Sequence, residues 1–165
     1  MDSISFIILG FSDSGIINSL TIDGIYIKNI DIDNSIAFMV FEQIIDLSIN
    51  NLTVTDMSLS NDSPVWIEID GLNTELFMNG LYMLNLDFYK SPAVDLFNTF
   101  SSITMSNLNF ENVTIDGDTS VIIFESIKMM IINGATFKNI SSSSESANNF
   151  MIQIDQTGKA WKISY

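Results

Sequence analysis

The sequence predicts an all-β chain folded as a single-stranded parallel β-helix, or β-solenoid, with about 27 residues per coil. Three observations predict this fold. A seven-residue pattern recurs five times, and its apolar residues alternate as in strands, changing parity at the same two places in every copy. No window shows helical periodicity. We therefore expect five to six coils of three short strands each, in a single segment covering residues 1–165.

The pattern is clearest at residues 107–113, which read NLNFENV, and it returns at 24–30, 51–57, 80–86 and 134–140. The steps between successive copies are 27, 29, 27 and 27 residues. Every copy opens with glycine or asparagine, the two residues that best tolerate a positive φ. We therefore place these residues at a corner of the coil: Gly24, Asn51, Gly80, Asn107 and Gly134.

Parity locates the corners within each copy. In the second copy Leu47 and Ile49 share one face, Leu52 and Val54 share the next, and Met57 opens a third. Because neighbouring side chains of a strand point to opposite faces, each change of parity marks a place where the strand must turn.

An additional apolar run precedes each copy and supplies the remaining strand of the coil. The runs are Ala37–Phe41, Val65–Ile69, Ala93–Phe97, Val121–Phe124 and Phe150–Ile154, and turn-forming residues separate them from the preceding copies. The runs at 37–41 and 121–124 are apolar on both faces, so we expect an insertion, a missing part of the chain or a protein partner to cover them.

One inward position is polar in every copy. Stacked about 4.8 Å apart, amide side chains there can bond to one another, which offsets the cost of burying them. We interpret this position as an internal, structural asparagine ladder and not as a ligand site: Asn29, Asp56, Asn85, Asn112 and Asn139.

The parity pattern, the ladder and the corners Phe110-Glu111-Asn112 and Phe137-Lys138-Asn139 resemble right-handed parallel β-helix repeat proteins. That group includes pectin-lyase-like folds and the polymorphic outer-membrane-protein type of surface protein. The resemblance implies an extracellular or cell-surface location. A leucine-rich repeat is the alternative fold, which is weakened by the strand-like runs 37–41 and 121–124 where a helix would lie.

Composition excludes several functions. The net charge of −14 disfavours nucleic acid and anionic membrane surfaces as partners. The absence of cysteine and histidine removes disulfides, thiolate zinc sites and the commonest general base, and we expect no cofactor. No apolar stretch is long enough to span a membrane, and the first ten residues lack the positive charge of a signal peptide.

The ends carry no recognisable cap. The run 150–154 continues the apolar series, and residues 161–165 would enter a further coil as the sequence ends. We therefore expect a fragment of a longer repeat protein, able to associate with itself end to end or laterally.

Pectin-lyase-like enzymes, by the resemblance, use arginine or lysine bases, calcium-binding carboxylates or paired aspartates on an outer face. Calcium is a hypothesis for the pairs Asp31/Asp33 and Asp116/Asp118, although aspartate-rich corners are usually turns. Four further carboxylates fall near one another but at shifted positions in the repeat, so we interpret them as a solvated acidic face: Glu42, Glu68, Asp95 and Glu125.

Two outward tyrosines are more suggestive of binding. Tyr26 and Tyr82 occupy the same outward position two coils apart, with Thr53 between them. A glycan-facing surface formed by their rings is a hypothesis, and the alternative is that they are ordinary amphipathic tyrosines on the surface of a sheet. Among the sequons, Asn61 lies in an expected loop and is the glycosylation candidate, whereas Asn112 and Asn139 are expected to point inward.

Together these features favour a non-catalytic β-solenoid segment of a secreted or cell-surface protein, acting as a spacer, an adhesive or a surface that recognises a glycan or another cell-surface protein. The alternative is a polysaccharide lyase or glycoside hydrolase of the pectin-lyase-like class.

Overall fold

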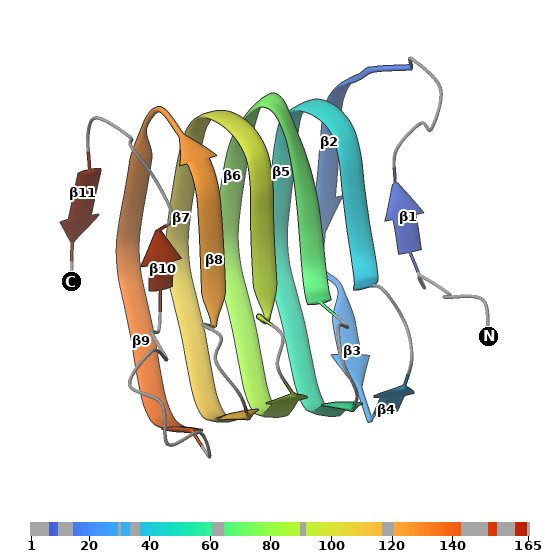
Figure 1. Ribbon diagram of the computed structural model, residues 1–165, viewed down its shortest axis with the longest axis vertical. Helices are drawn as coiled ribbons and strands as arrows, with labels where there is room; N and C mark the ends of the chain where they lie inside the picture. The colour runs from blue at the N-terminus through green and yellow to red at the C-terminus, as the bar shows by residue number, and fades with distance from the viewer. Residues whose placement is uncertain are drawn as a thin grey trace.

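The computed structural model describes residues 7–9, 15–29, 31–33, 37–60, 65–89, 92–116, 121–142, 152–154 and 161–164. Every regular element in this part of the chain is a β-strand, and the described pairings are all parallel. The predicted all-β parallel solenoid is confirmed (Figure 1). The strands are β1 (Ile7–Leu9), β2 (Ile17–Asp23), β3 (Tyr26–Lys28), β4 (Asp31–Asp33), β5 (Ala37–Ser60), β6 (Val65–Tyr89), β7 (Val94–Asp116), β8 (Ile122–Ile127), β9 (Met130–Ser142), β10 (Ile152–Ile154) and β11 (Trp161–Ser164).

The stack has about four turns, repeating at about 27 residues, and not the expected five to six. The difference lies at the two ends, where β1, β10 and β11 contribute strands of only three or four residues. In the middle turns strand pairing continues through the corners, so the expected short strands are joined into β5, β6 and β7, of 24, 25 and 23 residues. β1 and β11 lie at opposite ends of the stack (Figure 1).

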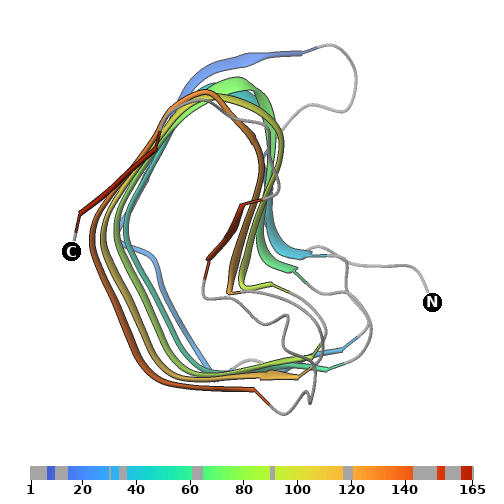
Figure 2. The same ribbon diagram turned by 60° about the vertical axis from the view of Figure 1, so that its left-hand side comes forward.

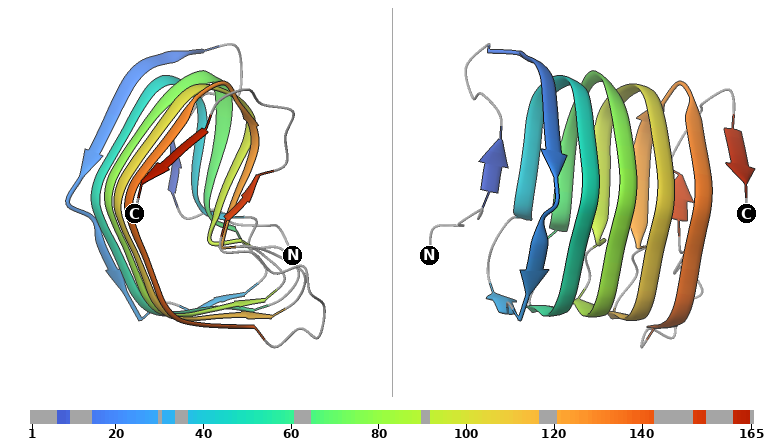
Figure 3. Two further views of the ribbon diagram at one scale, coloured as in Figure 1. Left: turned by 90° about the vertical axis from the view of Figure 1, so that its left-hand side faces the viewer. Right: turned by 180° about the vertical axis from the view of Figure 1, so that it is seen from behind.

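Each turn has three faces and a short final arm. The first face consists of residues 37–42, 65–70, 94–97 and 122–125, and it lies on the concave side of the stack (Figures 2 and 3). The second face consists of residues 44–50, 75–79, 102–106 and 130–133. The third consists of residues 52–55, 81–84, 108–111 and 135–138.

Single residues in the left-handed region turn the chain between these faces. The second corner, between the second and third faces, has φ values of 74°, 52°, 73°, 54° and 67° at Gly24, Asn51, Gly80, Asn107 and Gly134. The third corner follows the third face, with φ between 52° and 57° at Asn29, Asp56, Asn85, Asn112 and Asn139. Glycine and asparagine occupy nearly all of these positions because other residues are strained there.

The inward rows of the three faces merge into one apolar core. Equivalent residues of successive turns lie directly over one another, for example Leu47, Leu76 and Ile103 on the second face, and each of the three is at most 2% exposed. On the third face Phe110 and Phe137 stack with their ring centroids 5.2 Å apart. Strand pairing between turns and apolar contact within them therefore hold the same rows in register.

Candidate functional site

The asparagine ladder lies on the surface, and not in the interior as expected. Asn85, Asn112 and Asn139 are exposed, while Asp56 is half-buried. Each asparagine donates its Nδ2 to the preceding side chain: Asn85 to Asp56 at 2.7 Å, Asn112 to Asn85 at 2.8 Å and Asn139 to Asn112 at 2.9 Å. The expectation of an inward row is wrong because a left-handed residue breaks strand alternation and turns its side chain outward.

Asp56, the one charged residue of this ladder, also forms an ion pair with the preceding turn. Its Oδ2 lies 3.4 Å from Lys28 Nζ. The hydrogen bond from Asn85, with smaller effects from Thr55 and Lys28, lowers the pKa of Asp56. Asn29 opens the row at an exposed position, with its backbone N–H donated to the carbonyl oxygen of Thr55 at 3.2 Å. From Asp56 to Asn139 the ladder thus joins each turn to the one before it through side-chain hydrogen bonds.

Glycine and asparagine alternate from turn to turn at the second corner. Asn51 donates Nδ2 to Asp23 Oδ1 at 2.8 Å, and Asn107 donates Nδ2 to Asn79 Oδ1 at 2.8 Å. A Cβ added to Gly80 would stand 3.1 Å from Asn51 Oδ1. Because Gly80 has no side chain, the space beside it is free for the amide of Asn51 in the preceding turn.

The tyrosines of the third face share one row, as the sequence spacing indicates. Tyr26 pairs with Thr53, and Thr53 pairs with Tyr82. Tyr26 is 64% exposed and Tyr82 is 38% exposed. Sequence reasoning missed Phe77, an outward residue of the second face that is 44% exposed and lies in the same turn as Tyr82. Its alternation with the inward Leu76 and Met78 is the signal that could have found it.

The first face carries a closer acidic pair than we expected. Glu68 and Asp95 are not at shifted positions but are direct partners on β6 and β7, as Glu42 and Asp70 are on β5 and β6. The signal was available, because Glu68 and Asp95 stand the same 12 residues before Gly80 and Asn107. Neighbouring carboxylates on parallel strands repel one another.

Both members of this pair resist ionisation. Burial, followed by the charges of Asp95, Glu42 and Asp70, raises the pKa of Glu68. Burial and the charge of Glu125 raise the pKa of Asp95, although a hydrogen bond from the backbone N–H of Leu96 works in the opposite direction. The arrangement suits carboxylic acids that hold their protons more strongly than a fully solvated carboxyl does.

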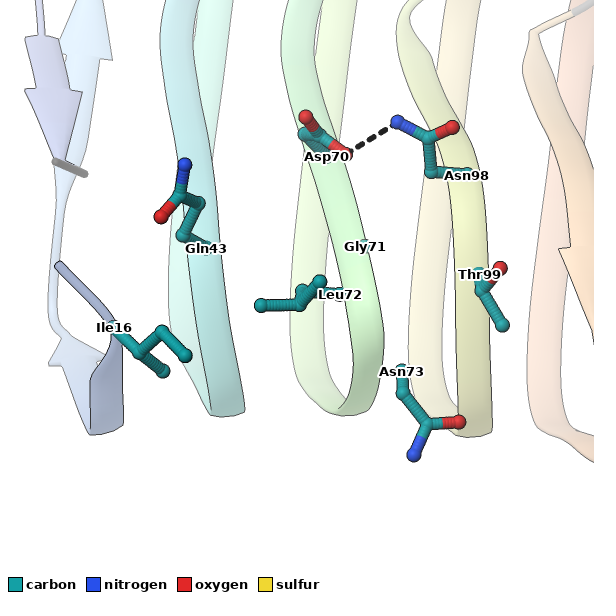
Figure 4. Close-up of a pocket in the computed structure, with 8 residues that line it drawn as sticks. All are labelled: Ile16, Gln43, Asp70, Gly71, Leu72, Asn73, Asn98 and Thr99. Carbon is teal, nitrogen blue, oxygen red and sulfur yellow. Dashed lines mark hydrogen bonds between the residues drawn. The ribbon is translucent and has the colours of Figure 1, made fainter. Parts of the chain in front are cut away.

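The first corner, between the first and second faces, contains a groove of about 720 Å³ (Figure 4). Its lining comes from four successive turns: Ile16, Gln43, Asp70, Gly71, Leu72, Asn73, Asn98 and Thr99. Gln43, Asn73 and Asn98 have φ values of 54°, 55° and 62°, which are strained for non-glycine residues. Nothing in the sequence periodicity indicated this groove.

The remaining candidates are less informative. Asp31, Asp33 and Asp116 lie at or near strand ends, whereas Asp118 and Asn61 lie outside the described residues. Within the described ranges, no group of three or more histidine, cysteine, aspartate or glutamate side chains is placed to hold a metal ion. Among these residues, too, no helix is long and apolar enough to cross a membrane.

Three sequon asparagines occupy corners. Asn112 and Asn139 are exposed, so an inward orientation does not exclude glycosylation there. In Asn51, Asn112 and Asn139 the Nδ2 group donates a hydrogen bond to a neighbouring turn. A glycan attached to any of these atoms would disturb that hydrogen bond.

Comparison of the chain with family models, with curated proteins and with solved structures found no match.

Proposed function

We propose that this chain is a non-catalytic solenoid segment of a secreted or cell-surface protein, and that its third face recognises glycans or another cell-surface protein. The observation that carries this proposal is the row of Tyr26, Thr53 and Tyr82. Two strand spacings separate the tyrosines by about 9.5 Å. Exposed rings in one row of a regular sheet can stack on successive sugar faces, and the small Thr53 between them leaves the row unobstructed.

The use of polar groups elsewhere supports a structural role for the rest of the chain. The asparagines of the second and third corners bond chiefly to adjacent turns, so they stiffen the stack. A spacer with one binding row fits this division. The finer resemblance to pectin-lyase-like and polymorphic outer-membrane-protein-like surface proteins is part of the same proposal.

A glycan array, read with and without calcium, tests the recognition function. We expect binding without cleavage products, lost in a Tyr26→Ala/Tyr82→Ala variant and retained in Tyr26→Phe/Tyr82→Phe, because stacking needs the ring and not the hydroxyl. Asn109→Ala, in the same outward row, is the matched control. Binding that survives loss of both rings would contradict the proposal.

Glu68 and Asp95 favour a second candidate, a glycoside hydrolase of the pectin-lyase-like class. Two half-buried carboxyls with raised pKa values on a concave face have the chemical character of a general acid and its partner. Product analysis on polysaccharides decides this alternative. Hydrolysis lost in both Glu68→Gln and Asp95→Asn would replace the non-catalytic proposal, and absence of products would leave that proposal standing.

A further inference from the structure

The groove at the first corner arises where the repeat is irregular. The second and third corners turn on one left-handed residue in every turn, but all the described register shifts fall at the first corner. Glu42 pairs with Asp70, 28 residues later, whereas Asp46 pairs with Glu75, 29 residues later. β6 therefore carries one additional residue at this corner, and bulges of this kind redirect side chains.

Specific contacts stabilise the bulge. Thr74 is 1% exposed, donates its hydroxyl to the carbonyl oxygen of Ile44 at 2.5 Å and accepts the backbone N–H of Leu72 at 3.0 Å. Ser101 donates its hydroxyl to the carbonyl oxygen of Thr74 at 3.1 Å. A Cβ on Gly71 would stand 2.7 Å from the carbonyl oxygen of Thr99. The groove is therefore pre-formed, which lowers the cost of binding.

The lining combines apolar and amide chemistry. Ile16 and Leu72 are 51% and 46% exposed, and their side chains point toward each other across the turn that carries Gln43 (Figure 4). Asn98 donates Nδ2 to Asp70 Oδ1 at 2.6 Å, and the amide of Gln43 has no hydrogen-bond partner among the described residues. Amide and carboxylate groups bind hydroxyls, while the apolar side chains suit the C–H face of a sugar ring.

Charge restricts the ligand class. Asp70 lines the groove, and Glu125 Oε2 accepts the backbone N–H of Asn98 at 3.3 Å. The ammonium of Lys128 is bound to Asn73 Oδ1 at 2.5 Å and brings one positive charge to the groove, and the sequence contains no arginine. Because the carboxylates of Asp70 and Glu125 outnumber this ammonium, an anionic ligand such as a polyuronate would be repelled, whereas a neutral one would not.

We propose that this groove binds a neutral glycan chain lying along the solenoid axis, across the four turns that line it. Three strand spacings give it a length of about 14 Å. The inference rests on the recognition function proposed above and adds a second, chemically distinct binding place, separated from Tyr26 and Tyr82 by the width of the second face.

Calorimetric titration of the chain with cellohexaose, mannohexaose, xylohexaose and hexagalacturonate tests this inference. We expect one of the three neutral hexaoses to bind and hexagalacturonate not to bind. A Gln43→Gly/Leu72→Ala variant, in which glycine retains the positive φ, should weaken binding at least tenfold. Asn98→Gly removes an amide of the groove while glycine again retains the positive φ, and it should also weaken hexaose binding. Thermal melting checks that each variant is folded.

The matched control is Asn109→Ala, an outward residue of the third face that does not line the groove, and it should leave hexaose affinity unchanged. Hexaose binding that is lost in Tyr26→Ala/Tyr82→Ala but kept in the groove variants would overturn the groove and leave the tyrosine surface standing. Binding of hexagalacturonate as tightly as a neutral hexaose, or binding of none of the four probes, would also overturn the groove. Failure of the recognition function proposed for the third face would appear separately, as array binding that survives Tyr26→Ala/Tyr82→Ala but is lost in the groove variants.

Discussion

At the third corner of this chain a single left-handed residue performs two tasks. It turns the backbone at the end of the third face, and it directs a polar side chain along the stack toward the neighbouring turns. Asn112 illustrates both tasks, with φ of 55°, a bond donated to Asn85 and a bond accepted from Asn139. Asparagine is suited to this position because it tolerates the backbone conformation and carries both a donor and an acceptor.

The two tasks can be separated by mutation. Asn112→Ala should lower the free energy of unfolding by about 2–3 kcal/mol, because it loses two hydrogen bonds and strains the backbone. Asn112→Gly loses the same bonds without the strain and should cost about 1–2 kcal/mol. Urea unfolding measures both values, with Asn109→Ala as control. Equal losses for alanine and glycine would show that φ contributes nothing.

Gly71 provides a steric test at the first corner. A Cβ there would stand 2.7 Å from the Thr99 carbonyl oxygen and 2.8 Å from Cε2 of Phe100. Gly71→Ala should therefore cost about 1–3 kcal/mol through overpacking. Gly24→Ala, where a Cβ would meet nothing within 4 Å, tests backbone conformation alone at φ of 74°. If Gly71→Ala unfolds with the same free energy as the unsubstituted chain, crowding at Gly71 is not the constraint.

At the scale of elements, the first face holds two carboxylates, Glu68 and Asp95, that are partly removed from solvent. The pKa values of Glu68 and Asp95 are raised in the folded chain. The folded state therefore binds their protons more tightly than the unfolded state, in which the pKa of these groups is about 4. Their destabilising effect is complete above the folded pKa and disappears as pH falls toward the unfolded value.

We therefore expect the melting temperature to rise as pH is lowered from 7 toward the unfolded pKa values of about 4. At still lower pH, protonation of Asp56, whose pKa is lowered from 3.8, removes stability. Glu68→Gln and Asp95→Asn should raise the melting temperature at pH 7 and reduce this pH dependence. Glu75→Gln removes the same charge from an exposed position as control, and an equal effect there would assign the dependence to net charge alone.

These same elements show which parts of the fold and of the candidate site the sequence predicts. Parity located the core rows of Leu47 and Leu52 because burial imposes a period of two on any strand. Parity wrongly predicted an inward side chain for Asn85, because the alternation of side chains between faces fails at a residue with a positive φ. It did not reveal the groove at Leu72 and Asn73, since one additional residue within a 29-residue step leaves no periodic signal.

At the scale of the whole molecule, each turn contacts its neighbours through parallel pairing along nearly its full length. β6 pairs with β5 on one side and β7 on the other over all three faces. Stability in such a stack is close to a sum over turns and their interfaces. The turn, and not the face, is therefore the unit that can be removed or added.

Deletion of residues 83–109 tests this unit. It joins Tyr82 to Phe110, the partner of Met83, and thereby removes one complete 27-residue turn in register. We expect a shorter chain that still melts cooperatively, at a lower temperature. Deletion of 83–110 places Glu111 at the inward position, and this variant should have a melting temperature well below that of the 83–109 deletion. Circular dichroism compares the two, and equal melting temperatures would argue against a fixed register.

The alternation of glycine and asparagine at the second corner makes the true building block two turns long. Gly80 leaves room for the Asn51 amide, and its missing Cβ would also stand 3.5 Å from Cε2 of Tyr82. Tyrosine follows glycine by two positions at Tyr26 and Tyr82, whereas threonine follows Asn51 at Thr53 and Gly134 at Thr136. Growth of such a rod by duplication would preserve the fit between glycine and the neighbouring asparagine only if turns were added in pairs.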